Sequence, residues 1–424
     1  MMDKKILVLS MSAWNSKVGS DTWATLLEGQ DPDNIANIAL REETPDSKVC
    51  NNYFTISESR VLKSICNRKI KTGYAFDEIN VSDRRQKDIE AHDKIYGGTK
   101  RNIYLKRMLR EIVWILGKWK SDELNRFVDD FKPDVVLYFM DGYIHFNRIC
   151  RYITKRTNAK SIGFFVDDTF TYKQNSGLGF KLFRFFQRKS LHKLASKTDA
   201  FWAITDMTKS EADEEFGIDC RIITKPLRKS IQFEETGIHK PITILYTGNL
   251  QIGRDKTLTK LVQAIKEMNS QDFVIDVYTR TNMSDAVLKE LECDFCNIHP
   301  AVEQDKVFDL QRNADILLFL EDTDGEDALS ARLSFSTKII DYLSCSKCIL
   351  AIGNKDTAPM KYFEKNGAAL IAQTTEEIKQ RLCEIVNDPD LISTTAYNAY
   401  ECGVKNHSKE RILKEVNDSI NGLF

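Results

Sequence analysis

The sequence predicts an α/β fold made of two doubly wound parallel sheets, each in its own domain. Three observations support this prediction. Short apolar runs that suit covered parallel strands alternate with helical patterns along the whole chain. A polar segment without periodicity, residues 225–240, interrupts the alternation, and a second strand–helix series starts after it. The charge changes sign near the same place: residues 1–250 hold 41 Lys and Arg against 33 Asp and Glu, whereas residues 251–424 hold 20 against 29.

Length and composition restrict the class of protein. A chain of 424 residues with 42% hydrophobic and 29% charged residues has the composition of a globular protein of two or three domains. No apolar run approaches the ~20 residues of a membrane-spanning helix, and we interpret Lys5–Met11 as a first strand rather than a signal peptide. Ten dispersed cysteines fit a reducing cytoplasm. Two C-x-x-C pairs, at 293–296 and 345–348, lie too far apart along the chain to favour a zinc site, and we expect no metal.

Acidic residues follow three strand-like runs of the first half. These residues are Asp141, Asp167, Asp168 and Asp206. Ligands of open α/β sheets bind outside the carboxyl ends of the strands. Asp168 is our first catalytic candidate, because two adjacent carboxylates before Thr169 and Tyr172 suit the deprotonation of an acceptor hydroxyl. The alternative is that Asp occupies these positions only because it favours loops and helix N-caps.

The loop after the first strand contains Gly19 and is followed by a predicted helix from Asp21 to Leu27. No complete G-x-G-x-x-G accompanies it, so a nucleotide-binding fingerprint is not established. Gly19 is a candidate for substrate binding, since glycine lets a ligand approach the backbone, and it equally suits a plain turn.

Two helical patterns of the first half are both basic and aromatic. They span residues 100–120 and 180–194, and no acidic residue interrupts the second. One interpretation is a core-facing stripe with a solvated basic face. The other is attachment to an anionic membrane surface, where basic amphipathic helices with aromatic residues bind. The sequence contains no recognised nucleic-acid-binding module, and we expect no nucleic-acid partner.

The run Leu333–Ile352 (LSFSTKIIDYLSCSKCILAI) predicts a loop, a short helix, a tight connection and a buried strand. Ser336 and Thr337 suit a helix N-cap, and the free N–H groups of a helix N-terminus favour an anion. Lys338 and Asp341 share one helix face, so that one side chain can meet a phosphate and the other a sugar hydroxyl. The alternative is a surface helix with a solvated charge pair.

Three segments of the second half resemble a known family. They are YTGNLQIGR (246–254), NADILLFL (313–320) and SFSTKIIDYLSCSKCILAI (334–352). Together they are similar to the nucleotide-sugar-binding domain of GT-B glycosyltransferases of family 4. Lys338 and Tyr342 match the Lys and Tyr of the family pattern, whereas Asp341 stands where Glu is usual. The resemblance covers about residues 240–424, and the first half matches only in its layout.

The family pattern also shows departures. Ser336, Ser346 and Cys348 replace a Pro, a Gly and a second Pro. Serine at 346 predicts that the helix–strand connection needs no positive φ. Glu326, in the acidic loop after NADILLFL, is the candidate for the earlier Glu of the family's paired acids.

The resemblance implies a GT-B architecture, in which two Rossmann-like doubly wound domains face a cleft. Residues 1–230 would bind the acceptor, residues 231–405 the nucleotide sugar, and a C-terminal helix within 406–424 would pack back on the first domain. The implied activity is a retaining, hexosyltransferase-type transfer from a nucleoside-diphosphate sugar to a glycan or lipid-linked acceptor in polysaccharide biosynthesis. The implied location is the cytoplasm or the inner membrane face, and the implied chemistry needs no cofactor.

The resemblance also implies roles for individual residues. Arg254 and Lys338 would stabilise the departing diphosphate, because fixed cations lower the energy of the charge that develops there. The remaining donor-binding candidates are Gly248, Asn249, Glu326, Ser336, Thr337, Asp341 and Tyr342. Two alternatives stay open: a nucleotide-sugar 2-epimerase on a similar two-domain fold, and a catalytically lapsed carbohydrate-binding protein.

Overall fold

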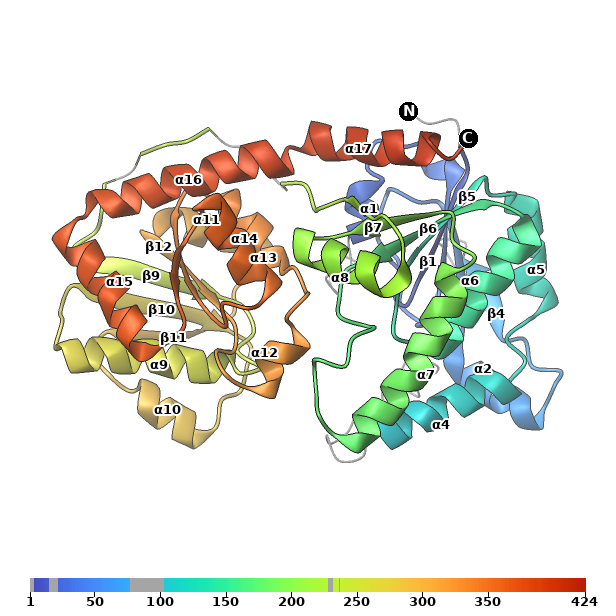
Figure 1. Cartoon of the computed structure of the whole chain (residues 1–424), viewed down its shortest axis with the longest axis horizontal. Coiled ribbons are helices and arrows are strands. Elements are labelled where there is room, and N and C mark those ends of the chain that lie inside the picture. The colour runs from blue at the N-terminus through green and yellow to red at the C-terminus, as the bar shows by residue number, and fades with distance from the viewer. Residues whose placement is uncertain (1–3, 15–21, 77–102, 228–231, 236) are drawn as a thin grey trace. The chain divides into compact units, whose positions relative to one another are not determined.

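The computed structural model divides the chain into two compact units (Figure 1). The first comprises residues 1–223 and 412–424, and the second comprises residues 224–411. The structure describes residues 4–14, 22–76, 103–227, 232–235 and 237–424.

The first unit is built on an eight-stranded sheet of order β4-β3-β2-β1-β5-β6-β7-β8. Its strands are β1 (Ile6–Ser10), β2 (Ile35–Ala39), β3 (Asn52–Ile56), β4 (Gly73–Phe76), β5 (Val135–Phe139), β6 (Lys160–Phe165), β7 (Ala200–Ala203) and β8 (Arg221–Ile222). Only β4 runs antiparallel to its neighbour. The chain fills one side of β1 with β2 and β3 and then returns to the other side at β5. The strand order therefore reverses between β1 and β5, which is where open α/β sheets bind ligands.

Helices pack on this sheet. They are α1 (Thr22–Leu26), α2 (Glu58–Cys66), α4 (Ile103–Leu116), α5 (Asp122–Phe131), α6 (Ile144–Thr157), α7 (Leu178–Ala195), α8 (Asp206–Phe216) and the 3₁₀ turn η1 (Pro32–Asn34). The last helix, α17 (Lys409–Asn421), also belongs here for most of its length. Trp202 Nε1 donates to Ser419 Oγ at 2.8 Å, and Gln30 Nε2 donates to Asn417 Oδ1 at 2.9 Å. These bonds attach the end of the chain to the first unit.

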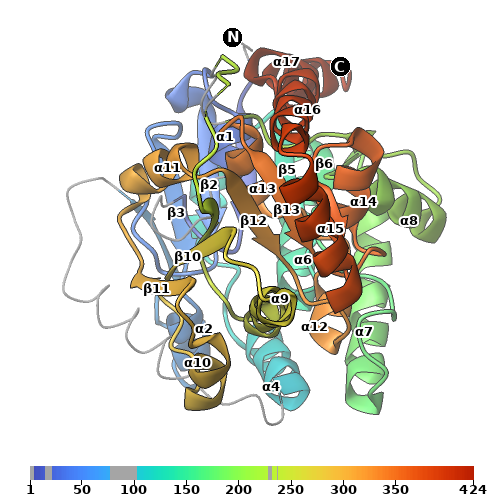
Figure 2. The ribbon, with the colours of Figure 1, turned by 90° about the vertical axis from the view of Figure 1, so that its left-hand side faces the viewer.

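The second unit contains a six-stranded parallel sheet of order β11-β10-β9-β12-β13-β14 (Figure 2). The strands are β9 (Ile242–Thr247), β10 (Phe273–Thr279), β11 (Cys296–Pro300), β12 (Ile316–Leu320), β13 (Cys348–Ile352) and β14 (Leu370–Ala372). The helices are α9 (Arg254–Met268), α10 (Asp285–Leu291), α11 (Gln304–Asn313), α12 (Glu326–Ser330), α13 (Thr337–Leu343), α14 (Ala358–Asn366), α15 (Thr375–Asn387) and α16 (Asp390–His407). Here the strand order reverses between β9 and β12.

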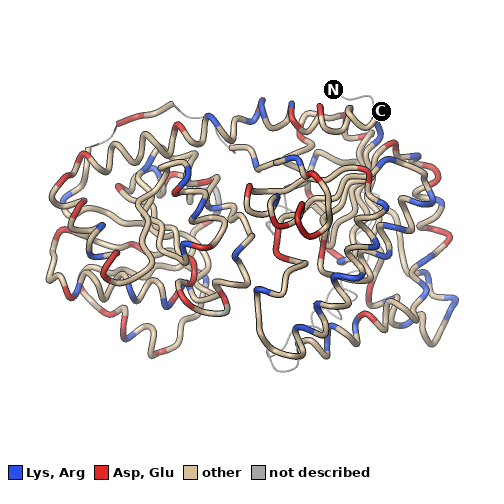
Figure 3. The backbone as a smooth tube through the Cα atoms, viewed as in Figure 1, with Lys and Arg blue, Asp and Glu red and all other residues tan. Residues whose placement is uncertain are grey.

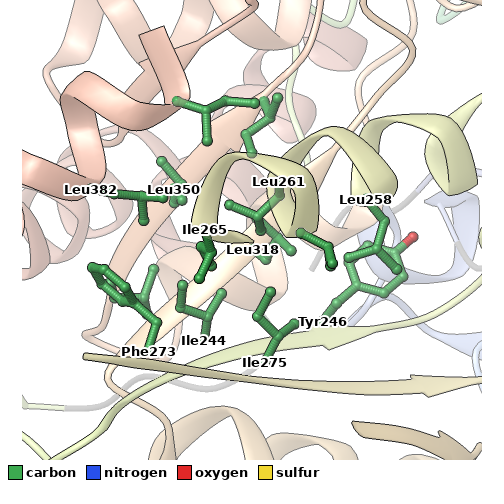
Figure 4. Packing of buried hydrophobic residues seen from close by; sticks show 14 of the residues in the cluster. Ile244, Tyr246, Leu258, Leu261, Ile265, Phe273, Ile275, Leu318, Leu350 and Leu382 are labelled. Carbon is green, nitrogen blue, oxygen red and sulfur yellow. The ribbon is translucent and has the colours of Figure 1, made fainter. Parts of the chain in front are cut away.

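The core of the second unit shows why these strands are parallel and covered (Figure 4). Ile244, Leu318 and Leu350, from three adjacent strands, have no exposed surface, and Leu261 and Ile265 of α9 pack over them. The helical spacing of the two α9 residues puts both side chains on the face that meets the sheet. Each such side chain stabilises the fold by about 1.5–3 kcal/mol through burial.

One segment without a prediction and one prediction concern local structure. Residues 43–76 are charged and lack a clear pattern in sequence apart from one helix, and they contain β3, α2 and β4. The expectation that the connection after α13 needs no positive φ is wrong, because Ser346 has φ +55°. The chain must reverse from α13 into β13 within a few residues, and a left-handed residue makes that reversal. Serine adopts it at roughly 1–2 kcal/mol above the ordinary conformation.

Candidate functional site

The loops after β9 and β12 meet at the point where the strand order of the second sheet reverses. β9 runs into Gly248, and α9 begins at Arg254. β12 ends at Leu320, directly before Glu321. The chain leaves β9 toward one side of the sheet and enters β12 on the other, so no crossover helix covers this edge. Side chains from both loops can therefore converge on one ligand.

Arg254 is fixed at this edge by both loops. Its Nε donates to the Leu320 carbonyl at 3.1 Å, and its Nη2 lies 3.0 Å from both carboxylate oxygens of the buried Glu321. Burial alone would lower the pKa of Arg254, but the charge of Glu321 raises that pKa above its ordinary value. The guanidinium is thus a permanent cation whose position hardly varies.

Lys338 approaches the same edge from α13. Its Nζ donates to the hydroxyl of Tyr246 at 2.6 Å and lies 3.9 Å from the centroid of the Tyr246 ring. Burial lowers the pKa of Lys338, and the cationic Arg254 lowers it further, to about 7, although Glu321 and Asp341 act in the opposite direction. So low a pKa means that the nearby negative charges do not offset the cost of burying the ammonium of Lys338. An anion bound here would stabilise its charged form.

Gly248 makes room for the lysine. Its φ is +134°, and a Cβ added to it would lie 2.7 Å from both Cε and Nζ of Lys338. A side chain at this position would therefore displace the end of the Lys338 side chain, and a φ in this range strains every residue except glycine. Glycine at this position therefore serves both the turn after β9 and the approach of Lys338.

Asn249 is hydrogen-bonded to neighbouring residues and stabilises the conformation of the loop after β9. Its carbonyl accepts from the Tyr246 hydroxyl at 2.6 Å, and its Oδ1 accepts from Gln251 N at 2.5 Å and from Thr281 Oγ1 at 3.2 Å. These bonds hold the loop against the end of β10. We therefore expect Asn249 to act on a ligand mainly through the loop's backbone.

The remaining candidates of the Leu333–Ile352 segment occupy different environments. Ser336 caps α13, with Oγ accepting from the N–H of Lys338 at 3.4 Å, and Thr337 is half-buried beside it. At seven residues, α13 is too short for its N-terminus to form an anion site by itself. Asp341 is half-buried on the same helix as Lys338. Tyr342 is fully buried, and its hydroxyl donates to the Leu318 carbonyl at 3.0 Å, so it attaches α13 to β12.

Two candidates are not fully described by the structure. Gly19 belongs to a segment that is not described, and the side chain of Glu326, the first residue of α12, is not described either.

Asp168 is described and lies in the first unit. It is buried, and Thr171 occupies both carboxylate oxygens, with N at 2.9 Å from Oδ1 and Oγ1 at 2.5 Å from Oδ2. That arrangement is a turn in which the carboxylate supports the backbone.

Asp141 is the acidic group that the fold places best in the first unit. It follows β5, at the reversal of strand order next to β1. Burial raises the pKa of Asp141 to about 6, and the negative charge of Asp167 contributes, while the backbone N–H of Tyr143 donates to Oδ1 at 3.2 Å. A carboxyl with a pKa near neutrality suits proton transfer. The sequence showed four strand-end carboxylates but not the strand order that distinguishes them.

The described residues contain no group of three or more His, Cys, Asp or Glu side chains that could hold a metal ion. All ten cysteines are free. Within the same part of the chain, no helix is both long and apolar enough to cross a bilayer.

Comparison with known proteins identifies the fold. No protein-family model and no curated protein sequence matches this chain, but solved structures do. HepE from Anabaena in complex with UDP aligns over 99% of this chain and 100% of its own, with 10% identity and a TM-score of 0.60. A glycosyltransferase from Rickettsia africae aligns over 100% and 99%, with 13% identity and a TM-score of 0.58. A putative UDP-N-acetylglucosamine 2-epimerase from Listeria monocytogenes aligns over 99% and 97%, with 13% identity and a TM-score of 0.51. The predicted fold class is confirmed: two parallel-sheet α/β units of the kind found in GT-B glycosyltransferases.

Proposed function

We propose that this chain is a retaining glycosyltransferase that moves a sugar from a nucleoside-diphosphate sugar to a glycan or lipid-linked acceptor. One observation supports the proposal most strongly. Lys338 and Arg254 lie at the reversal point of the second sheet, and Gly248 leaves no side chain between the loop and the lysine. Two cations beside the half-buried backbone of a glycine suit a diphosphate. The complexes of HepE with UDP and with UDP-glucose favour a UDP-sugar as donor.

The two cations would act at the step that breaks the bond between the sugar and the diphosphate. As that bond breaks, negative charge grows on the departing phosphate, and cations that are already in place stabilise it without reorganisation. Arg254 is held by Glu321. Lys338 has a pKa of about 7 in the unliganded protein, so a bound phosphate would raise that pKa and make the lysine fully charged. Asp341, on the same helix face, would bind the ribose hydroxyls.

The acceptor would meet the first unit. Asp168, our first catalytic candidate there, has both carboxylate oxygens bonded to Thr171. We therefore rank Asp141, whose pKa is about 6, ahead of it for binding the acceptor hydroxyl. Retention of anomeric configuration and the role of the leaving phosphate in accepting the proton are implied by the family resemblance.

We also propose that the first unit attaches to an anionic membrane surface from the cytoplasmic side. Helices α4 and α7 expose large apolar side chains, among them Ile115 (59% exposed) and Leu178 (85% exposed), beside lysines and arginines. Exposed apolar residues together with basic ones favour binding in the headgroup region of a bilayer. This arrangement fits polysaccharide assembly on a lipid-linked acceptor.

Donor binding tests the proposal. A thermal-shift screen with UDP- and GDP-sugars would identify the donor, because a bound ligand raises the melting temperature. Calorimetry and transfer assays would then compare Lys338→Ala and Arg254→Ala with Lys289→Ala, an exposed lysine on α10. We expect about 10- to 100-fold weaker binding in the first two variants, as for a lost charge-assisted hydrogen bond, and no change in the third. Wild-type kcat/KM in both site variants would remove this site assignment.

A nucleotide-sugar 2-epimerase is the second candidate, and the Listeria structure favours it specifically. The two activities differ in their need for an acceptor. An epimerase converts the donor sugar without acceptor, whereas a glycosyltransferase alone with its donor only hydrolyses it slowly. NMR of UDP-N-acetylglucosamine incubated with the protein distinguishes the two. Absence of binding to every nucleotide sugar would instead favour the lapsed carbohydrate-binding protein.

A further inference from the structure

A groove in the first unit lies between α4, α6 and α7, which pack against one another (Figure 1). Its volume is about 410 Å³, which is within the range of ligand pockets. One end is apolar. It is lined by Ile112 and Ile115 of α4, Ile144 of α6, and Phe183 and Phe186 of α7.

The other end of the groove is basic. Ile144, Arg148 and Arg151 follow one another at helical spacing on one face of α6. On α7, Phe186 precedes Lys189 and Lys193 in the same way. Both helices therefore change from apolar to basic along the chain, and Figure 3 shows the many basic positions of α4, α6 and α7.

The basic end continues into a second cavity of about 860 Å³ that shares Arg148, Arg151 and Lys193 with the groove. Its other cationic lining residues are Lys120, Lys155, Lys160 and Lys197. The only carboxylate among its described lining residues is Asp199, which already pairs with Lys160 at 3.4 Å and accepts from Ser161. The cavity thus has a large excess of positive charge.

The two shared arginines are bonded to backbone carbonyls rather than to carboxylates. Arg148 Nη1 donates to the Trp114 carbonyl and Arg151 Nε to the Asn147 carbonyl, each at 3.3 Å. Burial and the neighbouring charge of Arg148 lower the pKa of Arg151. An anion placed between them would relieve that repulsion.

Two further lining groups sit between the apolar and basic ends. Glu111, the carboxylate of the groove, is held by His145 Nδ1 at 2.8 Å and by the N–H of Ile144 at 3.1 Å. Ser190 is 6% exposed, and its Oγ has no hydrogen-bond partner among the described residues. Buried hydroxyls nearly always have a partner, so an additional polar ligand atom would complete this one.

We propose that this groove binds one anionic phospholipid of a bilayer, with an acyl chain along the apolar end and the phosphate between Arg148, Arg151 and Lys193. The charge of the basic end matches a phosphate, and the apolar end matches a hydrocarbon chain. Leu109 (53% exposed) and Phe185 (53% exposed) on the same helices would contact neighbouring lipids. The inference rests on the membrane attachment proposed above and makes it specific, and it does not involve the nucleotide-sugar site.

Short-chain lipids test a single-molecule site without a membrane. Dihexanoyl phosphatidylglycerol would be titrated calorimetrically into the full-length protein below its micelle concentration, in parallel with the neutral dihexanoyl phosphatidylcholine. We expect one equivalent of the anionic lipid to bind, and the neutral lipid to bind at least tenfold more weakly. Arg148→Gln with Arg151→Gln should weaken the anionic lipid by roughly 25-fold, since a basic residue near an anionic lipid surface contributes about fivefold. Phe186→Asp, which leaves both arginines in place, should also weaken it.

The matched control is Arg126→Gln with Lys132→Gln, which removes two exposed charges at α5 and its C-terminus. It should bind the anionic lipid like wild type. Equal affinity for the two lipids, or unchanged affinity in the Arg148→Gln/Arg151→Gln variant, would overturn the proposal. So would binding of farnesyl phosphate without binding of phosphatidylglycerol, which would assign the groove to a lipid-linked acceptor. Nucleotide-sugar titrations of the wild-type protein keep the two proposals separate. Absence of donor binding there would remove the glycosyltransferase proposal, whereas selective binding of the anionic lipid would leave the lipid site standing.

Discussion

Replacing Lys338 by methionine should stabilise the unliganded second unit while weakening the donor complex. Methionine keeps most of the length and volume of the side chain and removes the charge. Lys338 is half-buried, and its pKa is about 7 against an ordinary value of 10.5. A partly buried cation without enough nearby negative charge lowers the stability of the folded protein, and a bound anion restores that stability. Opposite effects on stability and on binding are therefore the signature of a phosphate site.

The magnitude follows from the pKa. A decrease from 10.5 to about 7 corresponds to about 5 kcal/mol of destabilisation when the lysine is charged in the folded protein. Methionine also loses the hydrogen bond to the Tyr246 hydroxyl, worth about 2 kcal/mol for a charged donor. The Lys338→Met variant should thus gain about 3 kcal/mol at pH 6. Between pH 7 and 10.5 the unfolded chain binds a proton that the folded chain does not, so wild-type stability rises with pH and the advantage of the variant disappears.

Calorimetric unfolding at several pH values checks this prediction. All five tryptophans lie between residues 14 and 202, so tryptophan fluorescence follows the first unit alone and should report the same transition in both proteins. In ligand titrations, wild-type affinity for the donor should fall as pH rises above 7, with uptake of a proton, and the variant should lack this dependence. A variant that is less stable than wild type at pH 6, or an identical pH dependence of binding, would refute the reasoning.

Three further substitutions have specific expected outcomes. Gly248→Ala should lower the stability of the folded protein by about 1–3 kcal/mol because of the φ at this position, and it should displace Lys338 and so weaken donor binding. Gly367→Ala is the control, since Gly367 has φ +57° and open space around it, and this variant should lose stability without losing donor affinity. Equal donor affinity in the two variants would contradict the steric argument. Arg254→Gln should cost about 3–5 kcal/mol in urea unfolding because Glu321 remains buried, and Arg254→Lys should not restore the loss, since one ammonium cannot reproduce the guanidinium contacts. Asp141→Asn should raise the stability of the folded protein by about 3 kcal/mol above pH 6 and leave it unchanged below pH 4, because the raised pKa of Asp141 disfavours the ionised carboxylate in the folded state. A stability difference between variant and wild type that stays constant across pH would show that this pKa is not raised.

The fold could be predicted because strands that are covered by helices on both faces of the sheet have continuous apolar sequences. The segments that became β5, β12 and β13 are recognisable in this way, and all their described residues are buried apart from the half-buried Phe139. The strands within residues 43–76 could not be assigned from the sequence, for a physical reason. β4 is a short antiparallel edge strand, and short edge strands carry little of the apolar pattern that identifies interior ones.

The site could be predicted only in part. The type and spacing of Lys338 and Asp341 indicated one helix face, but the sequence did not show that Tyr342 points into the core or that Asn249 is bound within its own loop. The first fact depends on a contact between residues far apart in the chain, and the second depends on the conformation of the loop after β9. The prediction at Ser346 was wrong because a left-handed conformation costs a serine only about 1–2 kcal/mol more than a glycine. The packing of the connection is enough to offset that cost.

Each unit holds a titratable group near the point where its strand order reverses. Asp141 follows β5 in the first unit, and the side chain of Lys338 on α13 approaches Gly248 after β9 in the second. Burial moves each pKa toward neutrality: that of Lys338 down to about 7 and that of Asp141 up to about 6. Lys338 is charged below its pKa and Asp141 above its own, so both charges exist together only in a narrow range between about pH 6 and 7. If the proposed sugar transfer requires both charges, the pH profile of kcat/KM, which reports the unliganded protein, should be bell-shaped with a maximum in that range. Asp141→Asn should remove the acidic limb and Lys338→Met the basic limb, and a flat profile in the wild-type protein would exclude at least one of these groups from the reaction.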